Sequence, residues 1–111
     1  MSTPRQLPPL SHLQFLALGV ILSSEEPGRV IRDVVADYGE RRTGAAFYQL
    51  MARLERDGLI QGWYEPVVVG DQAVRERRYR ITAAGTRAWR QTRAFYESVA
   101  AAAAQGRLAN A

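Results

Sequence analysis

The chain has 111 residues, no cysteine, and a net charge of +4 with a pI near 10.1. This length suits one domain with a modest core, and the absence of cysteine excludes disulfide frameworks and thiolate metal sites. All fifteen basic residues are arginine. GC-rich codon usage explains that choice, but a basic domain favours an anionic partner, nucleic acid first. No apolar run is long enough to span a bilayer, so we expect a cytoplasmic protein without a membrane partner.

The first part of the chain predicts a flexible arm followed by a buried helix. Residues 1–9 hold three of the five prolines and show no periodicity, which is typical of a loosely attached terminus. Ser11 can accept hydrogen bonds from the free amides of a helix start, and Gln14 completes a capping box. The apolar run that continues to Leu22 covers most of the helix surface, so this helix should be buried on several sides.

A second helix is predicted after a short break. Glu25 and Glu26 lie in the break, and we interpret them as a solvated loop. Pro27 suits the first turn of a helix, and apolar residues at helical spacing follow it. Gly39 is a natural end, because glycine adopts the left-handed backbone conformation without strain.

The third helix has both of its ends marked in the sequence. Thr43 is the expected N-cap, and Gly58 is the expected stop. An apolar stripe repeats at i, i+3, i+4 and i+7 between these ends. It consists of Phe47, Leu50, Met51 and Leu54. The opposite side of this helix is therefore free to face a partner.

The rest of the chain predicts a hairpin and a long last helix. Residues 59–65 and 74–81 have the composition of strands, and the Gly70-Asp71 pair between them signals a turn. A helix is predicted over residues 82–105. Aromatic and small residues recur along it at spacings of three and four, which indicates a seam like that of a coiled coil.

The order of these elements predicts a fold class: a mainly α winged helix-turn-helix with a small β-hairpin, in the order α-α-α-β-β-α. In this fold the third helix enters the major groove of DNA, and the hairpin, called the wing, lies against the backbone. The expected organisation has four parts. They are an arm at residues 1–9, the winged helix at 10–82, a dimerisation helix at 83–105 and a tail at 106–111.

Four local patterns point to one family. They are the Leu-rich LSHLQFLALGVIL at residues 10–22, Gly28 with Ile31, AFYQLMARLERDGLI at residues 46–60, and RRYRITAAG at residues 77–85. The last two are the most specific, and the four together cover nearly the whole chain. In this order they resemble the PadR family of bacterial transcriptional regulators. The resemblance implies a winged helix that binds double-stranded DNA as a homodimer, and the single short C-terminal helix resembles the smaller members.

The sequence departs from the PadR pattern at several positions. Arg29 and Val30 stand where the family usually shows Tyr and Glu. Ala46 replaces a usual Ser or Thr, and Gln49 stands where proline is frequent. The missing hydroxyl at Ala46 removes one expected contact to a phosphate or base, which affects the target sequence more than DNA binding itself.

The outer side of the third helix holds candidate DNA-binding residues. Gln49 can form paired hydrogen bonds with adenine and Arg53 with guanine, while the small Ala46 allows close approach and can meet a thymine methyl. Thr43 and the free amides at the helix start favour a phosphate. The hydroxyl of Tyr48, whose position resembles a tyrosine of the family, also suits a phosphate oxygen.

The wing is the second basic feature. Four arginines fall within residues 75–80. Arg75 and Arg77 share the inward face with Tyr79 but lie farther out, where we expect no core to cover them, and Arg78 lies on the opposite face. Together with those of the third helix, these three arginines are candidates for contact with DNA phosphates. The alternative is an edge strand that its charges protect from aggregation.

Two features of this surface have open alternatives. Arg53 and Arg56 can instead form a solvated face, paired with Glu55 or Asp57. The residues alone weigh this alternative about equally with DNA contact, and the family resemblance favours DNA contact. The second feature is Val67–Val69, which can extend the first wing strand, pack on a partner subunit or lie in a minor groove.

The last helix has more aromatic residues than a single chain of this size can cover. The candidate residues of a dimer interface are Trp89, Thr92, Phe95, Tyr96 and Val99. A two-fold dimer predicts a palindromic operator, read in successive major grooves. Trp89 and Tyr96 are also candidates for an effector pocket that admits a small flat aromatic molecule, as the resemblance to small PadR-like proteins implies. A filled dimer seam is the favoured alternative.

These patterns predict a sequence-specific transcriptional regulator, a repressor that works by occupying its operator. The alternative is a winged-helix protein-interaction module without DNA binding. The sequence has no nucleophile paired with a base and no phosphate-binding glycine loop, so we expect neither an enzyme nor a cofactor. His12 is the single histidine and has no clustered ligands, so no metal site is expected.

Overall fold

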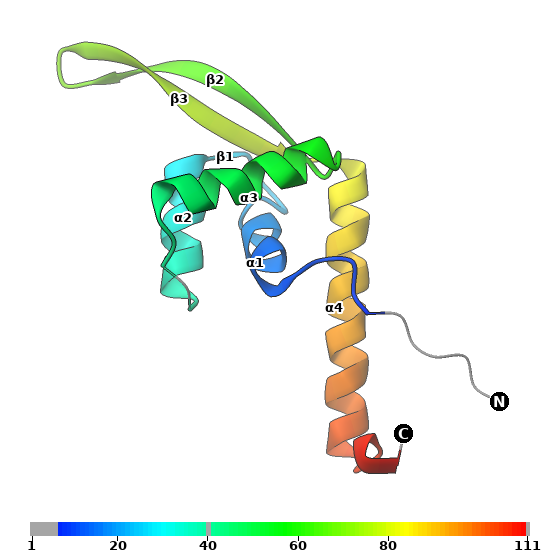
Figure 1. Cartoon of the computed structure of the whole chain (residues 1–111). Coiled ribbons are helices and arrows are strands. Elements are labelled where there is room, and N and C mark those ends of the chain that lie inside the picture. The colour runs from blue at the N-terminus through cyan, green and yellow to red at the C-terminus, as the bar shows by residue number, and fades with distance from the viewer. Residues whose placement is uncertain (1–6, 40, 111) are drawn as a thin grey trace.

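The computed structural model describes residues 7–39 and 41–110, which form helices and a three-stranded antiparallel sheet (Figure 1). The helices are α1 (His12–Val20), α2 (Gly28–Asp37), α3 (Gly44–Arg56) and α4 (Ala83–Ala104), followed by the short 3-10 helix η1 (Leu108–Asn110). The strands are β1 (Glu26–Pro27), β2 (Ile60–Val69) and β3 (Gln72–Ile81). This arrangement confirms the predicted winged helix-turn-helix class. Residues 1–6 of the predicted arm lie outside the described residues.

The helix starts follow the capping signals of the sequence. At α1, the hydroxyl of Ser11 accepts from the amide of Gln14 at 3.2 Å, and the Gln14 side chain accepts from the Ser11 amide at 3.0 Å. At α3, the hydroxyl of Thr43 accepts from the amide of Ala46 at 3.1 Å. These local contacts satisfy amides that a helix start leaves unpaired, which explains why the sequence located both starts correctly.

The sheet contains a strand that the sequence did not reveal. Glu26 pairs with Tyr79 and Pro27 with Arg78, so β1 adds a third strand to the hairpin in the order β1-β3-β2. The interpretation of Glu26 as solvated loop is therefore wrong. A strand of two residues is too short to show the alternation that identifies strands, and its proline is tolerated because β1 is an edge strand.

The wing is longer than predicted. Val67–Val69 extend β2 and pair with residues 72–74 of β3, up to the turn at Gly70-Asp71. Gly70 has a φ of 63°, which fits the first central position of a tight hairpin turn. The hairpin therefore projects well beyond the helices that support its base (Figure 1).

The core lies between the first three helices and the base of the hairpin. Its fully buried side chains come from every one of these elements, and the largest are Phe47, Leu18, Ile21, Ile31, Met51, Leu54 and Ile60. A close approach fixes the start of α4 to this core. The amide and hydroxyl of Thr82 donate to the carbonyls of Leu59 and Gly58 at 3.1 and 2.7 Å. A Cβ at Gly85 would overlap the Leu59 carbonyl oxygen, so this junction requires glycine.

Helix α4 packs on the body with its first half and with Tyr96, whose ring lies 6.1 Å from that of Phe15. Trp89 stacks on Phe15 of α1, with ring centroids 5.0 Å apart. Beyond Tyr96 the helix extends away from the other helices (Figure 1), and the long axis of the molecule measures 64 Å. None of the helices in the described ranges has both the length and the apolar character that a membrane span requires.

Candidate nucleic-acid interface

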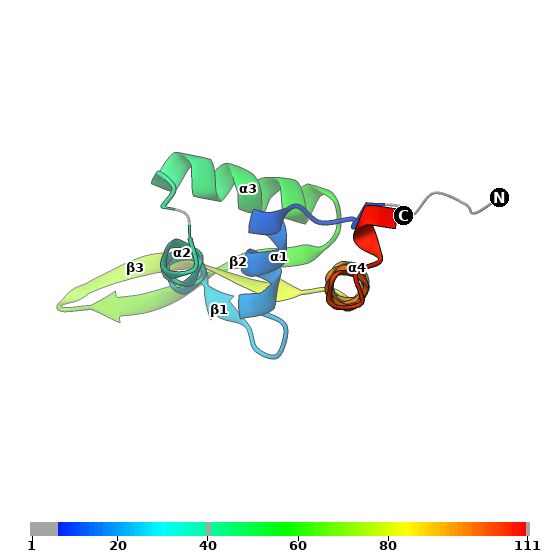
Figure 2. The ribbon, with the colours of Figure 1, turned by 90° about the horizontal axis from the view of Figure 1, so that it is seen from below.

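The outer face of α3 is uncovered. Phe47, Met51 and Leu54 are fully buried on its inner side. Figure 2 shows α3 along one edge of the molecule, with α1 and α2 on its inner side. The exposed outer side chains are Ala45, Gln49, Ala52, Arg53 and Arg56. Small residues thus alternate with polar ones on this face, which lets a flat or grooved partner come close to the helix.

Three of the predicted DNA-binding residues lie together on one flank of α3. Ala46, Gln49 and Arg53 line a hollow of about 390 Å³ beside the start of α1, and Ser11 and Arg42 are among its other lining residues. Gln49 and Arg53 are four residues apart, so their side chains lie on neighbouring turns of the same face. They can therefore reach adjacent positions of one partner.

The two arginines of this face differ in their partners. Nε of Arg56 pairs with Oδ1 of Asp57 at 3.2 Å, at the exposed end of the helix. Arg56 thus fits the alternative in which an arginine on this face is solvated and pairs with a neighbouring acidic residue. Arg53 has no hydrogen bond or ion pair within the described part of the chain, and its guanidinium keeps its donors for a partner.

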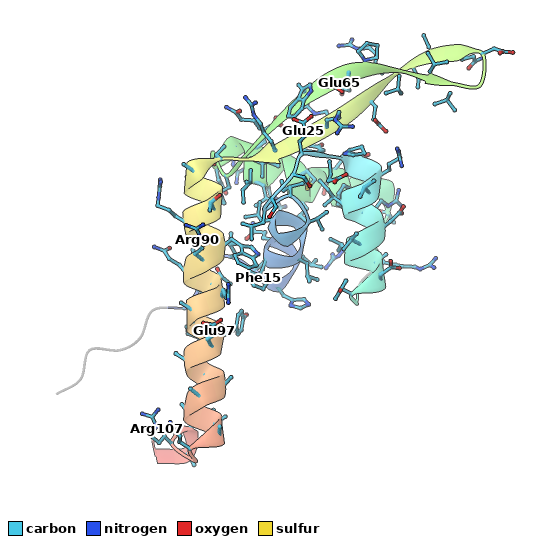
Figure 3. The ribbon with its side chains drawn as sticks, turned by 180° about the vertical axis from the view of Figure 1, so that it is seen from behind. Phe15, Glu25, Glu65, Arg90, Glu97 and Arg107 are labelled. Atoms are coloured by element: carbon cyan, nitrogen blue, oxygen red, sulfur yellow. The ribbon has the colours of Figure 1, made fainter. Side chains whose placement is uncertain are left out.

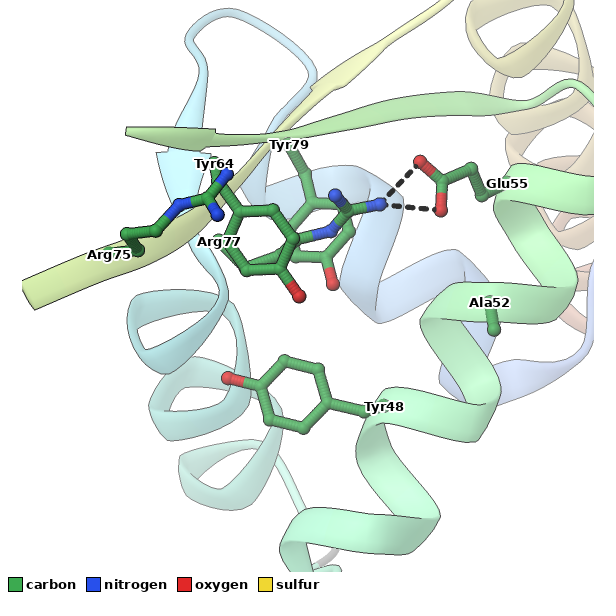
Figure 4. A pocket seen from close by; sticks show the side chains of 7 residues that line it. All are labelled: Tyr48, Ala52, Glu55, Tyr64, Arg75, Arg77 and Tyr79. Atoms are coloured by element: carbon green, nitrogen blue, oxygen red, sulfur yellow. Dashed lines mark hydrogen bonds and ion pairs between the residues drawn. The ribbon is translucent and has the colours of Figure 1, made fainter. Parts of the chain in front are cut away.

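The other flank of α3 faces the wing across an open hollow of about 670 Å³ (Figure 4). Its lining residues come from α3 and both wing strands, and they are Tyr48, Ala52, Glu55, Tyr64, Arg75, Arg77 and Tyr79. The structure thus puts Tyr48 on the opposite flank from Arg53. The Tyr48 ring packs edge-on against Phe47 at 5.2 Å and lies directly beside Gly28, which explains the small residue at the start of α2.

Arg77 is held in this hollow by an acidic residue of α3. Its Nη2 donates to both carboxylate oxygens of Glu55 at 2.9 Å. Its guanidinium lies 4.8 Å from the centre of the Tyr64 ring and 5.7 Å from that of Tyr79. The side chain is only 26% exposed. The expectation that nothing covers Arg77 is therefore wrong, because the sequence did not show that α3 reaches this strand.

The ionisation of this cluster follows from its surroundings. Burial lowers the pKa of Arg77, but the neighbouring Tyr79 hydroxyl and the Glu55 carboxylate outweigh burial, so the net pKa is raised. Burial also raises the pKa of Tyr79, more than the adjacent Arg77 lowers it. The cluster thus contains a charged guanidinium, a carboxylate that compensates it and a neutral phenol at physiological pH.

The other two wing arginines have different surroundings. Arg75 is exposed and lies over the Tyr64 ring at 4.8 Å, with no acidic partner in the described residues. Arg78 points to the opposite face, where it lies 3.5 to 3.8 Å from Glu25, Glu65 and Glu76. Figure 3 labels Glu25 and Glu65 on this side of the sheet. Three glutamates surround Arg78, so its charge is compensated within the chain, and that of Arg75 is not.

Sequence reasoning missed two residues of this site. The sequence offers Glu55 only as a partner for Arg53 or Arg56, but in the structure its carboxylate accepts instead from Arg77 and from the amide of Gly62 at 2.8 Å. Gly62 stands in the middle of β2, and glycine in a strand interior often marks a close approach of another group. That glycine was the available signal that a side chain from elsewhere lies against the strand.

The predicted dimer residues divide into buried and exposed ones. Thr92 is fully buried, and its hydroxyl donates to the Ala88 carbonyl at 2.8 Å. Its placement at a dimer interface is wrong, because the single chain leaves it no surface to offer a second copy. Phe95 and Val99 are half-buried, and Tyr96 is 45% exposed. The rings of Phe95 and Tyr96 lie 5.4 Å apart on α4.

The two candidate effector residues both pack on Phe15 of α1, with ring centroids 5.0 Å from it for Trp89 and 6.1 Å for Tyr96. Trp89 lines an apolar hollow of about 260 Å³ between α1, α2 and α4, and Tyr96 is not part of its lining. Ligand pockets usually exceed about 300 Å³ and are more enclosed. The indole of Trp89 packs instead against Phe15 and Gly19, so a single chain forms no pocket there that would hold a flat effector.

Comparison with known proteins identifies the fold. The sequence matches no family model and no curated protein. A PadR-family regulator of Eggerthella lenta matches with a TM-score of 0.63 and 26% identity, over 84% of this chain and 79% of that chain. A PadR-family regulator of Clostridium difficile matches with a TM-score of 0.72 and 17% identity, over 86% and 97%.

A third match was solved with DNA bound. It is Bacillus subtilis PadR in complex with operator DNA, with a TM-score of 0.58 and 18% identity, over 74% of this chain and 46% of that chain. The present chain therefore spans less than half of that protein. These matches agree with the element order and the wing described above: the fold of this chain is similar to that of PadR-like winged-helix regulators.

Proposed function

We propose that this chain is a DNA-binding transcriptional regulator that binds duplex DNA through the outer face of α3 and the adjoining wing. The observation that carries this proposal is the uncovered, partly basic face of α3 beside a projecting hairpin. One duplex can contact both, with α3 in the major groove and the wing along the backbone. Bacillus subtilis PadR, which has a similar fold, was solved in complex with operator DNA, and this supports DNA binding by the present chain.

Sequence-specific contact is assigned to the flank that holds Gln49 and Arg53. Both side chains are exposed, and amide and guanidinium groups form paired hydrogen bonds with adenine and guanine respectively. The side chains of Ala46 and Ala52 are small, so they do not keep a partner away from Gln49 and Arg53. This combination suits a helix that must approach base edges closely.

Phosphate contact is assigned to two places. At the start of α3, Thr43 caps the helix, no acidic residue occupies the first turn, and the exposed Arg41 adds positive charge. The helix dipole and the free amides favour an anion there. Near the wing, Arg75 and the hydroxyl of Tyr48 border the same hollow, where a backbone phosphate can lie between helix and hairpin.

We further propose that the regulator acts as a homodimer on a palindromic operator, as a repressor in the cytoplasm, where DNA is accessible. The second half of α4 carries Phe95, Tyr96 and Val99, and it extends beyond the body after the contact of Tyr96 with Phe15. A second copy that packs on this segment across a two-fold axis would cover these side chains and present two α3 helices to one duplex. Residues 83–105 would then form the dimerisation helix of a winged helix at residues 10–82.

A salt titration tests the proposal. Fluorescence anisotropy with a labelled random duplex should give an affinity that falls steeply as potassium chloride rises, because arginines that bind phosphates release counterions. A winged helix that binds only proteins should show no such dependence. The proposal fails if the chain does not bind duplex DNA at low salt.

A further inference from the structure

One carboxylate joins α3 to both strands of the wing. Glu55 lies in the last turns of α3, and its Oε1 accepts from the amide of Gly62 on β2 at 2.8 Å. The same carboxylate accepts from Arg77 on β3 at 2.9 Å through each oxygen (Figure 4). We call Glu55, Gly62 and Arg77 the wing anchor. It acts where the hairpin leaves the body, so it can set the angle between α3 and the wing.

The residue opposite Glu55 on β2 is adapted to this contact. A Cβ at Gly62 would lie 2.7 Å from the Glu55 Oε1 and 2.8 Å from the Arg77 Nη2. Both distances are too short for carbon against these atoms, so a side chain at residue 62 would displace the ion pair. A glycine in the strand interior costs stability in itself, and the room it leaves for the wing anchor explains its presence.

The wing anchor also decides what Arg77 can bind. Its guanidinium is bonded to a carboxylate and flanked by the rings of Tyr64 and Tyr79, at 4.8 and 5.7 Å from their centres. A phosphate could reach Arg77 only by competing with Glu55. Arg75 lies over the same Tyr64 ring at 4.8 Å but is exposed and has no acidic partner in the described residues.

We infer that Glu55 is a positioning residue that fixes the wing against α3 and withdraws Arg77 from phosphate binding, so that Arg75 alone of this pair contacts the DNA backbone. This inference rests on the proposed function. It goes beyond the assignment of basic wing residues to phosphates, because it assigns different roles to two arginines on one face of the same strand. Arg77 is bonded to Glu55 of α3, whereas Arg75 is exposed and has no acidic partner in the described residues.

The salt dependence of DNA binding separates the two arginines. Each phosphate that an arginine neutralises contributes about 0.9 to the slope of log K against log salt concentration. We expect Arg75→Met to make this slope shallower by about 0.9 per protomer, and Arg77→Met, which keeps an unbranched chain between the two rings, to leave it unchanged. A slope that falls equally in both variants overturns the inference.

Removing the charge of Glu55 provides the converse test. Glu55→Gln keeps an oxygen that can accept from the Gly62 amide but no longer compensates Arg77. The freed guanidinium then lies beside Arg75, and the slope should become steeper by about 0.9 per protomer. A purely structural role would lower the melting temperature without steepening the slope. A slope that stays at the wild-type value overturns the withdrawal of Arg77.

The positioning role has a spectroscopic readout. Trp63 follows Gly62 on β2, and it becomes the only tryptophan in a Trp89→Phe background because the chain has two. Time-resolved anisotropy of Trp63 should show a larger fast component in Glu55→Ala than in the background protein. An unchanged decay would show that the wing does not depend on Glu55. If the wild-type chain binds no duplex, the proposed function fails, whereas this readout still tests the positioning role.

Discussion

Glu55 and Arg77 are twenty-two residues apart in the sequence, yet the guanidinium donates to both carboxylate oxygens at 2.9 Å. The pair is partly covered, with the two side chains 33% and 26% exposed. The pair joins the hairpin to α3, and a second ion pair, between Arg29 of α2 and Glu76 of β3 at 2.9 Å, joins the hairpin to α2.

The first prediction concerns stability. Glu55→Ala removes the acceptor of the Gly62 amide and the partner of Arg77, and leaves both partly buried donors unpaired. We expect the free energy of unfolding to fall by about 1–2 kcal/mol, at the lower part of the usual range because solvent still screens the pair. Denaturation by urea measures it.

The matched control for this change is Glu97→Ala. Glu97 pairs with Arg93 at 2.8 Å on the surface of α4, and this pair is about twice as exposed. Such a pair contributes only about 0.5 kcal/mol or less. If the free energy of unfolding falls equally in the two variants, the contact of Glu55 with the wing stabilises the fold no more than an ordinary surface ion pair does.

A second prediction concerns the junction between the wing and α4. Gly85→Ala would push a methyl group against the Leu59 carbonyl oxygen and the Ile81 side chain. We expect a loss of about 1–3 kcal/mol from this overpacking, although alanine normally favours a helix. Thermal unfolding followed by circular dichroism measures the loss.

Gly44 provides the control for this substitution. It lies in the first turn of α3, where a Cβ would meet only the flexible end of Arg32 at 3.4 Å. Gly44→Ala should therefore be neutral or stabilising. If both alanine variants behave alike, the close approach at Leu59 is not the reason for glycine at residue 85.

These contacts show which parts of the fold the sequence could reveal. Helix starts depend on neighbours three residues apart, so Ser11 and Thr43 were readable as caps. β1 has two residues and no period, so only its pairing with β3 makes it a strand. Periodicity placed Arg77 on the inner face of the wing but could not show that Glu55 reaches it.

Thr92 shows a different limit of sequence reasoning. A hydroxyl within an aromatic seam looks like a surface group, and its spacing from Trp89 and Tyr96 fitted an interface. Its hydroxyl instead donates to the Ala88 carbonyl four residues earlier. This local hydrogen bond satisfies the hydroxyl, so a threonine can be buried within a helix. Whether Thr92 is buried therefore depends on how α4 packs on the body, and the spacing of residues along the sequence does not show that.

A third prediction concerns recognition. Gln49→Ala and Arg53→Ala should each reduce affinity for a selected operator by about 1–3 kcal/mol, because each removes a paired contact to a base. Their affinity for random duplex should fall much less. The measurement compares both duplexes by anisotropy at one salt concentration.

Arg93→Ala is the control for recognition. It removes one positive charge from an exposed position on α4, away from α3 and the wing. This variant should bind both duplexes as the wild type does. An equal loss of preference in Arg93→Ala would mean that net charge, and not the face of α3, determines the choice of sequence.

A fourth prediction concerns alkaline pH. Burial raises the pKa of Tyr79 in the folded chain, so the unfolded chain releases this proton at a lower pH, near 10. The contribution of Tyr79 to stability is therefore complete below about pH 10 and is lost as the pH rises through the higher folded pKa. In Tyr79→Phe, the part of the alkaline loss of stability that Tyr79 causes should be absent. Unfolding measured in urea at a series of alkaline pH values tests it, and equal slopes in both proteins would contradict it.

The last prediction concerns assembly. Tyr96 is 45% exposed on the second half of α4, and its ring lies beside those of Phe95 and Phe15. If a second copy covers this segment, Tyr96→Glu places a charge in an apolar interface, which is strongly unfavourable without a partner. We expect this variant to sediment as a monomer at concentrations where the wild type is a dimer. Val68→Glu changes an equally apolar position at the wing tip, which is 76% exposed, and should leave the dimer intact. Dissociation by both variants would show that the effect of Tyr96→Glu is not specific to α4. A wild type that sediments as a monomer would remove the basis for a palindromic operator.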